Sequence, residues 1–210
     1  MTDALRAGID VLGLAVGHAA HGKLLAYIAL LEKWNRTHSL TAIRGRDRMI
    51  THHLLDSLAV IAHLPARTGL RVADVGSGGG VPGIPLAIAR SDWRVTLIDS
   101  NRKKAAFLTQ AAIELALPNV DVIAARVETV MVPAGFDVVI SRAYSALARF
   151  VQQTDQLRAA DGRWVAMKGA LPQAELAALP AAVRVEATPA LRVPGVAGER
   201  HLVIMTAASR

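Results

Sequence analysis

The chain has 210 residues, enough for one domain with a substantial core, and 52% of them are apolar although only 4% are aromatic. It contains no cysteine and no uninterrupted apolar run of about eighteen residues, which excludes disulfides, thiolate metal sites and a transmembrane helix. The formal net charge of +7 favours a polyanionic partner such as RNA. Arginine and alanine also rise together in GC-rich coding sequences, so the charge supports a function only if it gathers on one face. Because the first residues lack a signal-peptide pattern, we expect a cytoplasmic protein without membrane contact.

The N-terminal part of the chain has the pattern of helices. Residues 4–17 alternate aliphatic with small residues and predict a short helix. A longer helix is predicted from His21, where apolar residues recur at helical spacing: Leu24, Leu25, Ile28, Leu31 and Trp34. Asp47 is a fair N-cap for a third helix that reaches about residue 61. We therefore expect one domain over residues 1–210, with a helical N-terminal cap at 1–65 and an α/β core at 70–210.

The remaining sequence alternates strands with helices. Strands are predicted at 71–75, 94–99, 120–124, 136–142, 163–168, 183–187 and 201–205. Helices are predicted after a glycine-rich loop, from a cap at Ser100 to Leu115, from 146 to 160, and from Pro172. This alternation predicts an α/β fold with a mostly parallel sheet and helices on both faces. The last two strands are joined too briefly for a helical crossover, so the last strand is expected to be antiparallel.

Two interpretations compete for the glycine-rich loop that follows the first strand. Glycines there let backbone N–H groups approach a ligand next to the start of a helix. Gly78, Gly80 and Gly83 match the G-x-G-x-x-G pattern of dinucleotide-binding folds, which would make the chain a nicotinamide-dependent oxidoreductase. Counted from Asp74, the run Asp-Val-Gly-Ser-Gly is instead typical of methyltransferases that use S-adenosylmethionine (SAM). The motif favours the methyltransferase, and the antiparallel end of the sheet agrees with it.

Polar residues at the strand ends are the candidates for ligand contacts, because an open parallel sheet binds ligands beyond the carboxyl ends of its strands. Asp99 could accept both ribose hydroxyls of a bound adenosine, and Glu128 could read the adenine edge, unless either is an ordinary surface acid. Asp74 is expected to hold the loop glycines through their N–H groups rather than to touch the ligand. Arg142 would face the reacting centre and bind an RNA phosphate or the ligand carboxylate, or it would form a salt bridge with a nearby acid.

No metal site or nucleophile motif stands out in the sequence. His52 and His53 are adjacent and point to different faces of a helix, so they cannot act as a pair of metal ligands. His18 and His21 have a possible helical spacing, but neither a carboxylate nor a third histidine follows at a suitable distance. A Walker loop and a G-x-S-x-G elbow are also absent from the sequence. We therefore expect no bound metal.

Several stretches together resemble one family, over roughly residues 30–205. They are residues 32–35, 39–43, 53–58, 74–86, 99–108, 126–128, 140–143, 168–169 and 200–202. In order and content they are similar to the bacterial ribosomal RNA small-subunit methyltransferase G family, also called glucose-inhibited division protein B. The continuation Pro82-Gly83-Ile84-Pro85 after the glycine loop is specific to that family among methyltransferases. One departure is Ser39, where the family usually has Asn.

The resemblance implies a substrate, a cofactor and a set of contacts. SAM would donate a methyl group to N7 of one guanine in the 16S rRNA of the small ribosomal subunit, within a Rossmann-like methyltransferase sheet. SAM contacts are implied at positions matching Gly76, Val81, Val127, Glu128 and Arg142, and the motif and strand-end arguments add Gly78 and Asp99. The chain is expected to act as a monomer.

This chemistry agrees with the absence of an acid–base motif. Guanine N7 has a free lone pair and no proton, so its attack on a sulfonium methyl needs positioning rather than a general base. Arg142 and Lys168 are the candidates for holding phosphate or neighbouring bases. The alternatives are a SAM enzyme of the same fold that acts on another RNA or a small molecule, the nicotinamide oxidoreductase, and a non-catalytic RNA-binding module.

Overall fold

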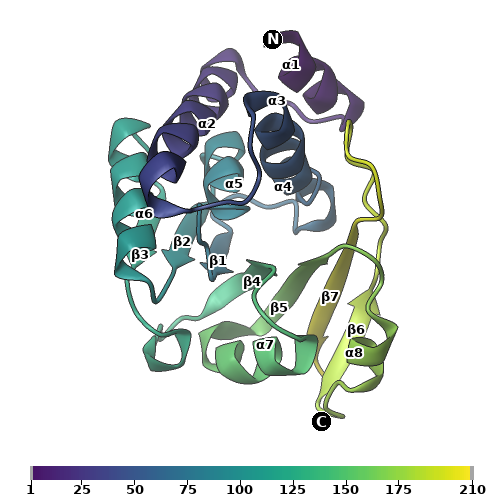
Figure 1. The fold of residues 1–210 in the computed structure, drawn as a ribbon. Helices are drawn as coiled ribbons and strands as arrows, with labels where there is room; N and C mark the ends of the chain where they lie inside the picture. The colour runs from purple at the N-terminus through teal and green to yellow at the C-terminus, as the bar shows by residue number, and fades with distance from the viewer. Residues whose placement is uncertain (1, 209–210) are drawn as a thin grey trace.

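The computed structural model describes residues 2–208 and is built on a seven-stranded sheet of order β3-β2-β1-β4-β5-β7-β6 (Figure 1). The strands are β1 Arg71–Val75, β2 Arg94–Ile98, β3 Val120–Ile123, β4 Phe136–Arg142, β5 Arg158–Lys168, β6 Val183–Ala187 and β7 His201–Ala207. The five strands from β3 to β5 pair in parallel, whereas β7 is antiparallel to both β5 and β6. The predicted mostly parallel sheet with an antiparallel last strand is confirmed.

Helices cover both faces of the sheet, as predicted. One face carries α2 His18–His38, α5 Gly83–Ala89 and α6 Arg102–Glu114, and the other carries α7 Leu147–Thr154 and the short α8 Gln173–Ala177 (Figure 1). Successive strand residues point to opposite faces. Val72 accordingly packs in the core cluster under α2, α5 and α6, while Ala73 packs in the cluster under α7.

The N-terminal helices belong to the core on the α2 face. They are α1 Thr2–Val11, α2, α3 Arg46–Met49, a π-helix at Ile50–Leu55, α4 Asp56–Leu58 and a 3₁₀ turn at Ile61–His63. The boundaries differ from prediction: the first helix ends at Val11 rather than 17, the second begins at His18, and the third begins at Arg46 after Gly45, whose φ is +82°. Asp47 therefore lies inside the third helix and is not its N-cap.

Three further boundaries were predicted wrongly. The cap of α6 is Asn101 rather than Ser100, since the Asn101 side chain accepts hydrogen bonds from the N–H groups of Lys103 and Lys104. The helix predicted to reach 160 ends at Thr154, and β5 begins at Arg158 instead of 163.

The early start of β5 follows from its pairing with β4. Arg158 pairs with Phe136, but the next pair joins Arg163 to Val138, so extra residues bulge out of β5 between these two pairs. Gly162 fits the bulge because a Cβ there would lie 2.5 Å from the Phe136 carbonyl oxygen. The helix-forming residues before the bulge predicted a helix, and tertiary pairing overrode that local preference.

Asp137, the second residue of β4, is a buried carboxylate that forms ion pairs with Arg71, the first residue of β1, and with Arg67. The Asp137 carboxylate accepts from Arg71 at 2.9 Å and contacts Arg67 at 2.7 Å. Burial alone would raise the pKa of Asp137, but the hydrogen bonds and charges of Arg71 and the charge of Arg67 hold it below its ordinary value.

We expect Asp137→Asn to lower the free energy of unfolding by about 2 kcal/mol, because hydrogen bonds to a buried charged group are lost. The pKa of Asp137 is lowered on folding, so this contribution is fully present above the unfolded-state pKa near 4 and disappears as the pH falls through the folded-state value. Urea denaturation between pH 7 and pH 3 tests both points. A wild-type advantage that grows on acidification would contradict the assignment.

Candidate active site

The carboxyl ends of β1, β2 and β4 meet at one edge of the sheet, and the predicted site residues follow these ends. The glycine loop after β1 is bonded to β2: the N–H of Gly76 donates to the Ile98 carbonyl at 2.9 Å, and the N–H of Gly78 donates to Asp99 at 2.9 Å. Gly76 and Gly78 have φ values of +69° and +56°, which residues with a Cβ rarely adopt. The glycines thus allow the loop to turn back onto the end of β2.

Asp74 closes the loop from below, as predicted. Its side chain is fully buried, and Oδ2 accepts from the N–H of Gly83, the first residue of α5, at 2.9 Å. Burial raises the pKa of Asp74 to about 7, against the opposing effect of this hydrogen bond. Asp74 therefore ties the start of the loop to its end and is not available to a ligand.

Helix α2 supports the same loop from outside the sheet. The buried Tyr27 hydroxyl donates to the carbonyl of Gly79, which lies in the middle of the loop. Sequence reasoning missed this residue. The signal was present, because Tyr27 lies among Leu24, Ile28 and Leu31 on the apolar face of α2, where a hydroxyl needs a partner. The N-terminal helices are therefore part of the site's support.

A cleft of about 130 Å³ opens between the ends of β1 and β2, and its lining includes Gly76, Asp99, Val127, Glu128 and Tyr144. Asp99 is almost buried and accepts one N–H at each oxygen, from Asn101 at 2.8 Å and from Gly78. A carboxylate offers about four lone-pair directions, so two remain for a pair of ribose hydroxyls. This donor and acceptor set fits the adenosine part of SAM.

The far wall of the cleft is the turn that follows β3. Val127 is buried and begins a 3₁₀ turn, whereas Glu128 is exposed and accepts a hydrogen bond from Gln153. The structure thus brings Val127 and Glu128 to the cleft of Gly76 and Asp99. Val81 packs against the apolar core instead and does not line this cleft.

Tyr144 covers the glycine loop and was also missed. A Cβ at Gly76 would lie only 2.7 Å from the Tyr144 ring, so glycine is needed for this approach as well as for its backbone angle. The Tyr144 hydroxyl donates to Gln153 at 3.0 Å, and the preceding Ala143 has a φ of +56°. Because the tyrosine follows Arg142 by two residues, the end of β4 forms one side of the cleft.

A second pocket, of about 420 Å³, lies on the other side of the same segment. Arg142 and Ala143 line it together with Lys168 and Arg200, and the helical cap contributes Thr41, His53 and Asp56. Lys168 donates to Glu175 at 2.8 Å and to the Ser145 carbonyl at 3.2 Å. The pocket is therefore basic on the sheet side and closed by the N-terminal helices on the other.

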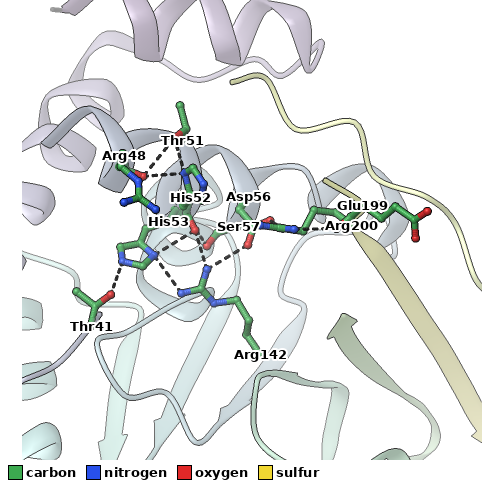
Figure 2. Close-up of polar contacts among 10 residues, drawn as sticks. All are labelled: Thr41, Arg48, Thr51, His52, His53, Asp56, Ser57, Arg142, Glu199 and Arg200. Carbon is green, nitrogen blue, oxygen red and sulfur yellow. Dashed lines mark hydrogen bonds and ion pairs between the residues drawn. The ribbon is translucent and has the colours of Figure 1, made fainter. Parts of the chain in front are cut away.

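Arg142 is held by three groups of the cap (Figure 2). One of its terminal nitrogens donates to the His52 carbonyl at 2.7 Å and to Asp56 at 3.1 Å, and the other lies 3.0 Å from His53 Nδ1. The sequence left open whether Arg142 binds a ligand or forms a salt bridge, and the structure contains the salt bridge.

His53 is neutral in this network. Its Nδ1 lies 3.0 Å from a nitrogen of Arg142 and 3.1 Å from the His52 carbonyl; acceptance from the guanidinium, which can only donate, assigns the ring hydrogen to Nε2, 2.9 Å from Thr41 Oγ1. Burial and the positive charge of Arg142 lower the pKa of His53 to about 4. Thr41 is fixed in turn by two hydrogen bonds with Asn35. Sequence analysis considered His53 only as a metal ligand and as part of the family resemblance.

A family model for rRNA small subunit methyltransferase G matches residues 20–203. The chain belongs to this family. The Ribosomal RNA small subunit methyltransferase G of Nitrosospira multiformis is 50% identical over 97% of this chain and 96% of its own length. That of Pseudomonas paraeruginosa is 51% identical over 97% of this chain and 94% of its own length.

Solved methyltransferases share the fold at low identity. The ribosomal protein L11 methylase of Lactobacillus delbrueckii subsp. bulgaricus matches with a TM-score of 0.57 at 16% identity, covering 80% of this chain and 81% of that one. Mitomycin 7-O-methyltransferase MmcR gives a TM-score of 0.62 at 17% identity, covering 77% and 56% of the two chains. The chain is a SAM-dependent methyltransferase, and the nicotinamide alternative raised by Gly78, Gly80 and Gly83 is wrong.

Ser39, the departure from the family pattern, ends helix α2. Its φ and ψ are 49° and 50°, the left-handed conformation typical of a residue after a helix, and its side chain is exposed. Asn adopts this conformation more readily than Ser. The usual Asn therefore has a backbone reason, independent of any substrate contact.

In the part of the chain that the structure describes, no helix is long and apolar enough to cross a membrane. Residues 2–208 also contain no group of three or more His, Asp or Glu side chains placed to hold a metal ion.

We expect Ser39→Gly to raise the free energy of unfolding by about 0.5–1 kcal/mol, because glycine adopts the left-handed conformation without a steric penalty. Ser39→Asn should give a smaller gain, and neither change should alter methyl transfer. Thr37→Gly is the control, since a glycine placed inside the last turn of α2 should instead destabilise, by roughly 0.3 kcal/mol on helix propensity alone. Chemical denaturation measures all three, and a loss of stability in Ser39→Gly would contradict this account.

Proposed function

We propose that the chain transfers a methyl group from SAM to N7 of one guanine in the 16S rRNA of the small ribosomal subunit. The observation that carries the proposal is the placement of the two pockets on either side of residues 142–144. The cleft of Gly76 and Asp99 suits adenosine, and the basic pocket of Arg142 and Lys168 suits a nucleotide. Relatives that bear the name Ribosomal RNA small subunit methyltransferase G support the choice of RNA.

The surroundings suit a reaction that needs no general base. Bound SAM supplies a methyl group on a sulfonium, and guanine N7 has a lone pair without a proton to remove. Asp56, the one acid among the described residues that line the basic pocket, is already engaged by Arg142 and Arg200. The residues of this chain then contribute by orienting the two reactants in line.

The basic pocket supports RNA as the substrate rather than a neutral small molecule. Arg142, Lys168 and Arg200 line it, and Asp56 is the only acid among the described residues of its lining. Cations in a hollow lined partly by apolar side chains attract phosphate groups, and such binding weakens steeply with salt. We assign Arg142 and Lys168 to positioning the RNA, and Gly76, Gly78, Asp99, Val127 and Glu128 to binding SAM. Val81 and Arg142, which were also predicted to contact SAM, do not line the cofactor cleft: Val81 packs against the core and Arg142 lines the basic pocket.

We further propose that the enzyme acts as a monomer in the cytoplasm, with residues 1–65 as a fixed cap on the core at 70–210. Leu5 and Leu24 of the cap pack in the same buried cluster as Val72 of the sheet, which supports one domain. The bond from Tyr27 to the Gly79 carbonyl supports a cap that takes part in shaping the cofactor site.

The test of the function is methyl transfer from labelled SAM to small subunits that lack the modification, followed by mapping of the labelled base. We expect label at N7 of a single guanine. Label on another RNA or position would keep the methyltransferase and discard the proposed substrate. Wild-type protein that binds SAM but labels neither subunits nor free 16S rRNA would contradict the proposal.

We expect Asp99→Asn to weaken SAM binding by about 10–100-fold, because hydrogen bonds to a charged acceptor contribute about 1.5–3 kcal/mol and each 1.4 kcal/mol is tenfold. The amide oxygen still accepts from the Gly78 N–H, so the loop should keep its shape. Isothermal titration calorimetry measures the affinity. Asp121→Asn, at an exposed position of β3 outside the cleft, is the matched control and should bind SAM normally. Equal SAM affinities for the wild type, Asp99→Asn and Asp121→Asn would remove Asp99 from the cofactor site.

We expect Lys168→Ala to lower kcat/KM for small subunits by about tenfold or more, since one charged contact to phosphate is lost, while SAM affinity changes by less than about threefold. We expect the loss in kcat/KM and not in SAM affinity because Lys168 lines the basic pocket and does not line the cofactor cleft. Steady-state transfer and SAM titration measure the two quantities. Normal RNA kinetics in this variant would remove Lys168 from the RNA site.

A further inference from the structure

Asp56 occupies an unusual position in the basic pocket. Its side chain is only 5% exposed, and its two oxygens are shared between two arginines: Oδ2 lies 3.1 Å from Arg142 Nη1, and Oδ1 lies 3.2 Å from Arg200 Nε (Figure 2). Arg142 ends β4, and Arg200 directly precedes β7. A single carboxylate of the helical cap therefore joins two separate segments of the core.

The π-helix before Asp56 gives Arg142 a second acceptor next to the carboxylate. In an α-helix the Asp56 N–H would donate to the carbonyl of His52, but here it is directed to the carbonyls of Thr51 and His53. The His52 carbonyl instead accepts from Arg142 at 2.7 Å. The wider turn thus frees a backbone acceptor beside the Asp56 carboxylate, and π-turns of this kind are frequent at functional sites.

The two arginines depend on Asp56 to different degrees. Without its charge, Arg142 would keep the His52 carbonyl and the neutral His53 ring. Arg200 would keep only the carbonyl of its neighbour Glu199 among the described partners of its side chain. Two guanidinium groups also repel each other, so removal of the shared carboxylate should release Arg200 first. Its side chain is 28% exposed and has room to move away.

We propose that Asp56 is a positioning residue for methyl transfer, which holds Arg142 and Arg200 side by side so that both guanidinium groups meet the phosphates next to the target base. This inference rests on the proposed function. Arginine suits the task because its planar fork binds phosphate oxygens in a fixed geometry, provided that the fork itself is held in place. Asp56 supplies that support and touches neither the methyl group nor the base.

The test compares Asp56→Asn with Asp137→Asn, because each aspartate is a buried carboxylate shared by two arginines. Asp137 is the second residue of β4, near the end of the strand opposite Arg142. We expect Asp56→Asn to lower kcat/KM for small subunits by about 10–100-fold, the loss of one or two charged contacts. We expect the slope of log Kd against log salt to fall by about one, as one phosphate contact is lost. Asp137→Asn should change neither quantity.

Arg200 supplies the second arm of the experiment. Arg200→Ala should lose the same unit of salt slope, and Asp56→Asn combined with Arg200→Ala should lose no more than either alone, because both act through one contact. Arg200→Lys keeps the charge without the fork and should recover the slope but not the full turnover. If Asp56→Asn does not fold, the salt slope and turnover of Arg200→Ala and Arg200→Lys still test the inference.

A wild-type salt slope in Arg200→Ala would overturn the inference, and so would wild-type turnover in folded Asp56→Asn. Additive losses in the double variant would overturn it too, since Asp56 would then act independently of Arg200. Wild-type enzyme is assayed first on unmodified subunits. Absence of label there contradicts the proposed function, whereas normal labelling with an unchanged Asp56→Asn contradicts only the role of Asp56.

Discussion

The hydrogen bond between the Asp74 carboxylate and the N–H of Gly83 is the contact on which the cofactor cleft depends. It spans the whole glycine loop, from the end of β1 to the start of α5, inside the core. Gly83 cannot be replaced without a rearrangement, because a Cβ there would lie 2.8 Å from the Asp74 carboxylate and 2.2 Å from Leu97. Burial disfavours the charged carboxylate and raises its pKa to about 7, so the loop is closed at an electrostatic cost. That cost is consistent with a site whose loop geometry matters more than its stability.

The helical cap completes the site at two points, and the two have different chemistry. Tyr27 contacts the glycine loop through a neutral hydrogen bond in a buried environment, and the segment from Thr41 to Asp56 contacts the end of β4 through charges. The charged contact remains compatible with burial because His53 is neutral and Asp56 is shared by two arginines. A cap fixed in both ways can hold the glycine loop and the basic pocket in one arrangement.

The sequence predicted the sheet well, and it selected residues that the fold brings to one cleft, because both follow from local pattern. Strand alternation gave six of the seven strands within about two residues, and the rule that ligands bind at the carboxyl ends of parallel strands selected Asp99 and Arg142. The predicted start of β5 was wrong, because Arg158 joins the sheet opposite Phe136 through a bulge that no local signal predicts. Tyr144, Asp56 and Arg200 were missed as site residues for a related reason. Their roles arise from segments that meet only after folding, and Asp56 and Arg200 are 144 residues apart.

The position of Arg142 reconciles its two predicted roles. The ion pair with Asp56 is typical of a structural role. The Arg142 side chain is nevertheless 22% exposed and lines the basic pocket. Tyr144 follows two residues later and covers the cofactor loop. A guanidinium has five N–H donors, and the groups of the cap engage only its two terminal nitrogens from one side. The remaining donors are free for a ligand while the cap fixes the direction of the fork. The salt bridge with Asp56 therefore does not remove Arg142 from the basic pocket, because the side chain that it holds still lines that pocket.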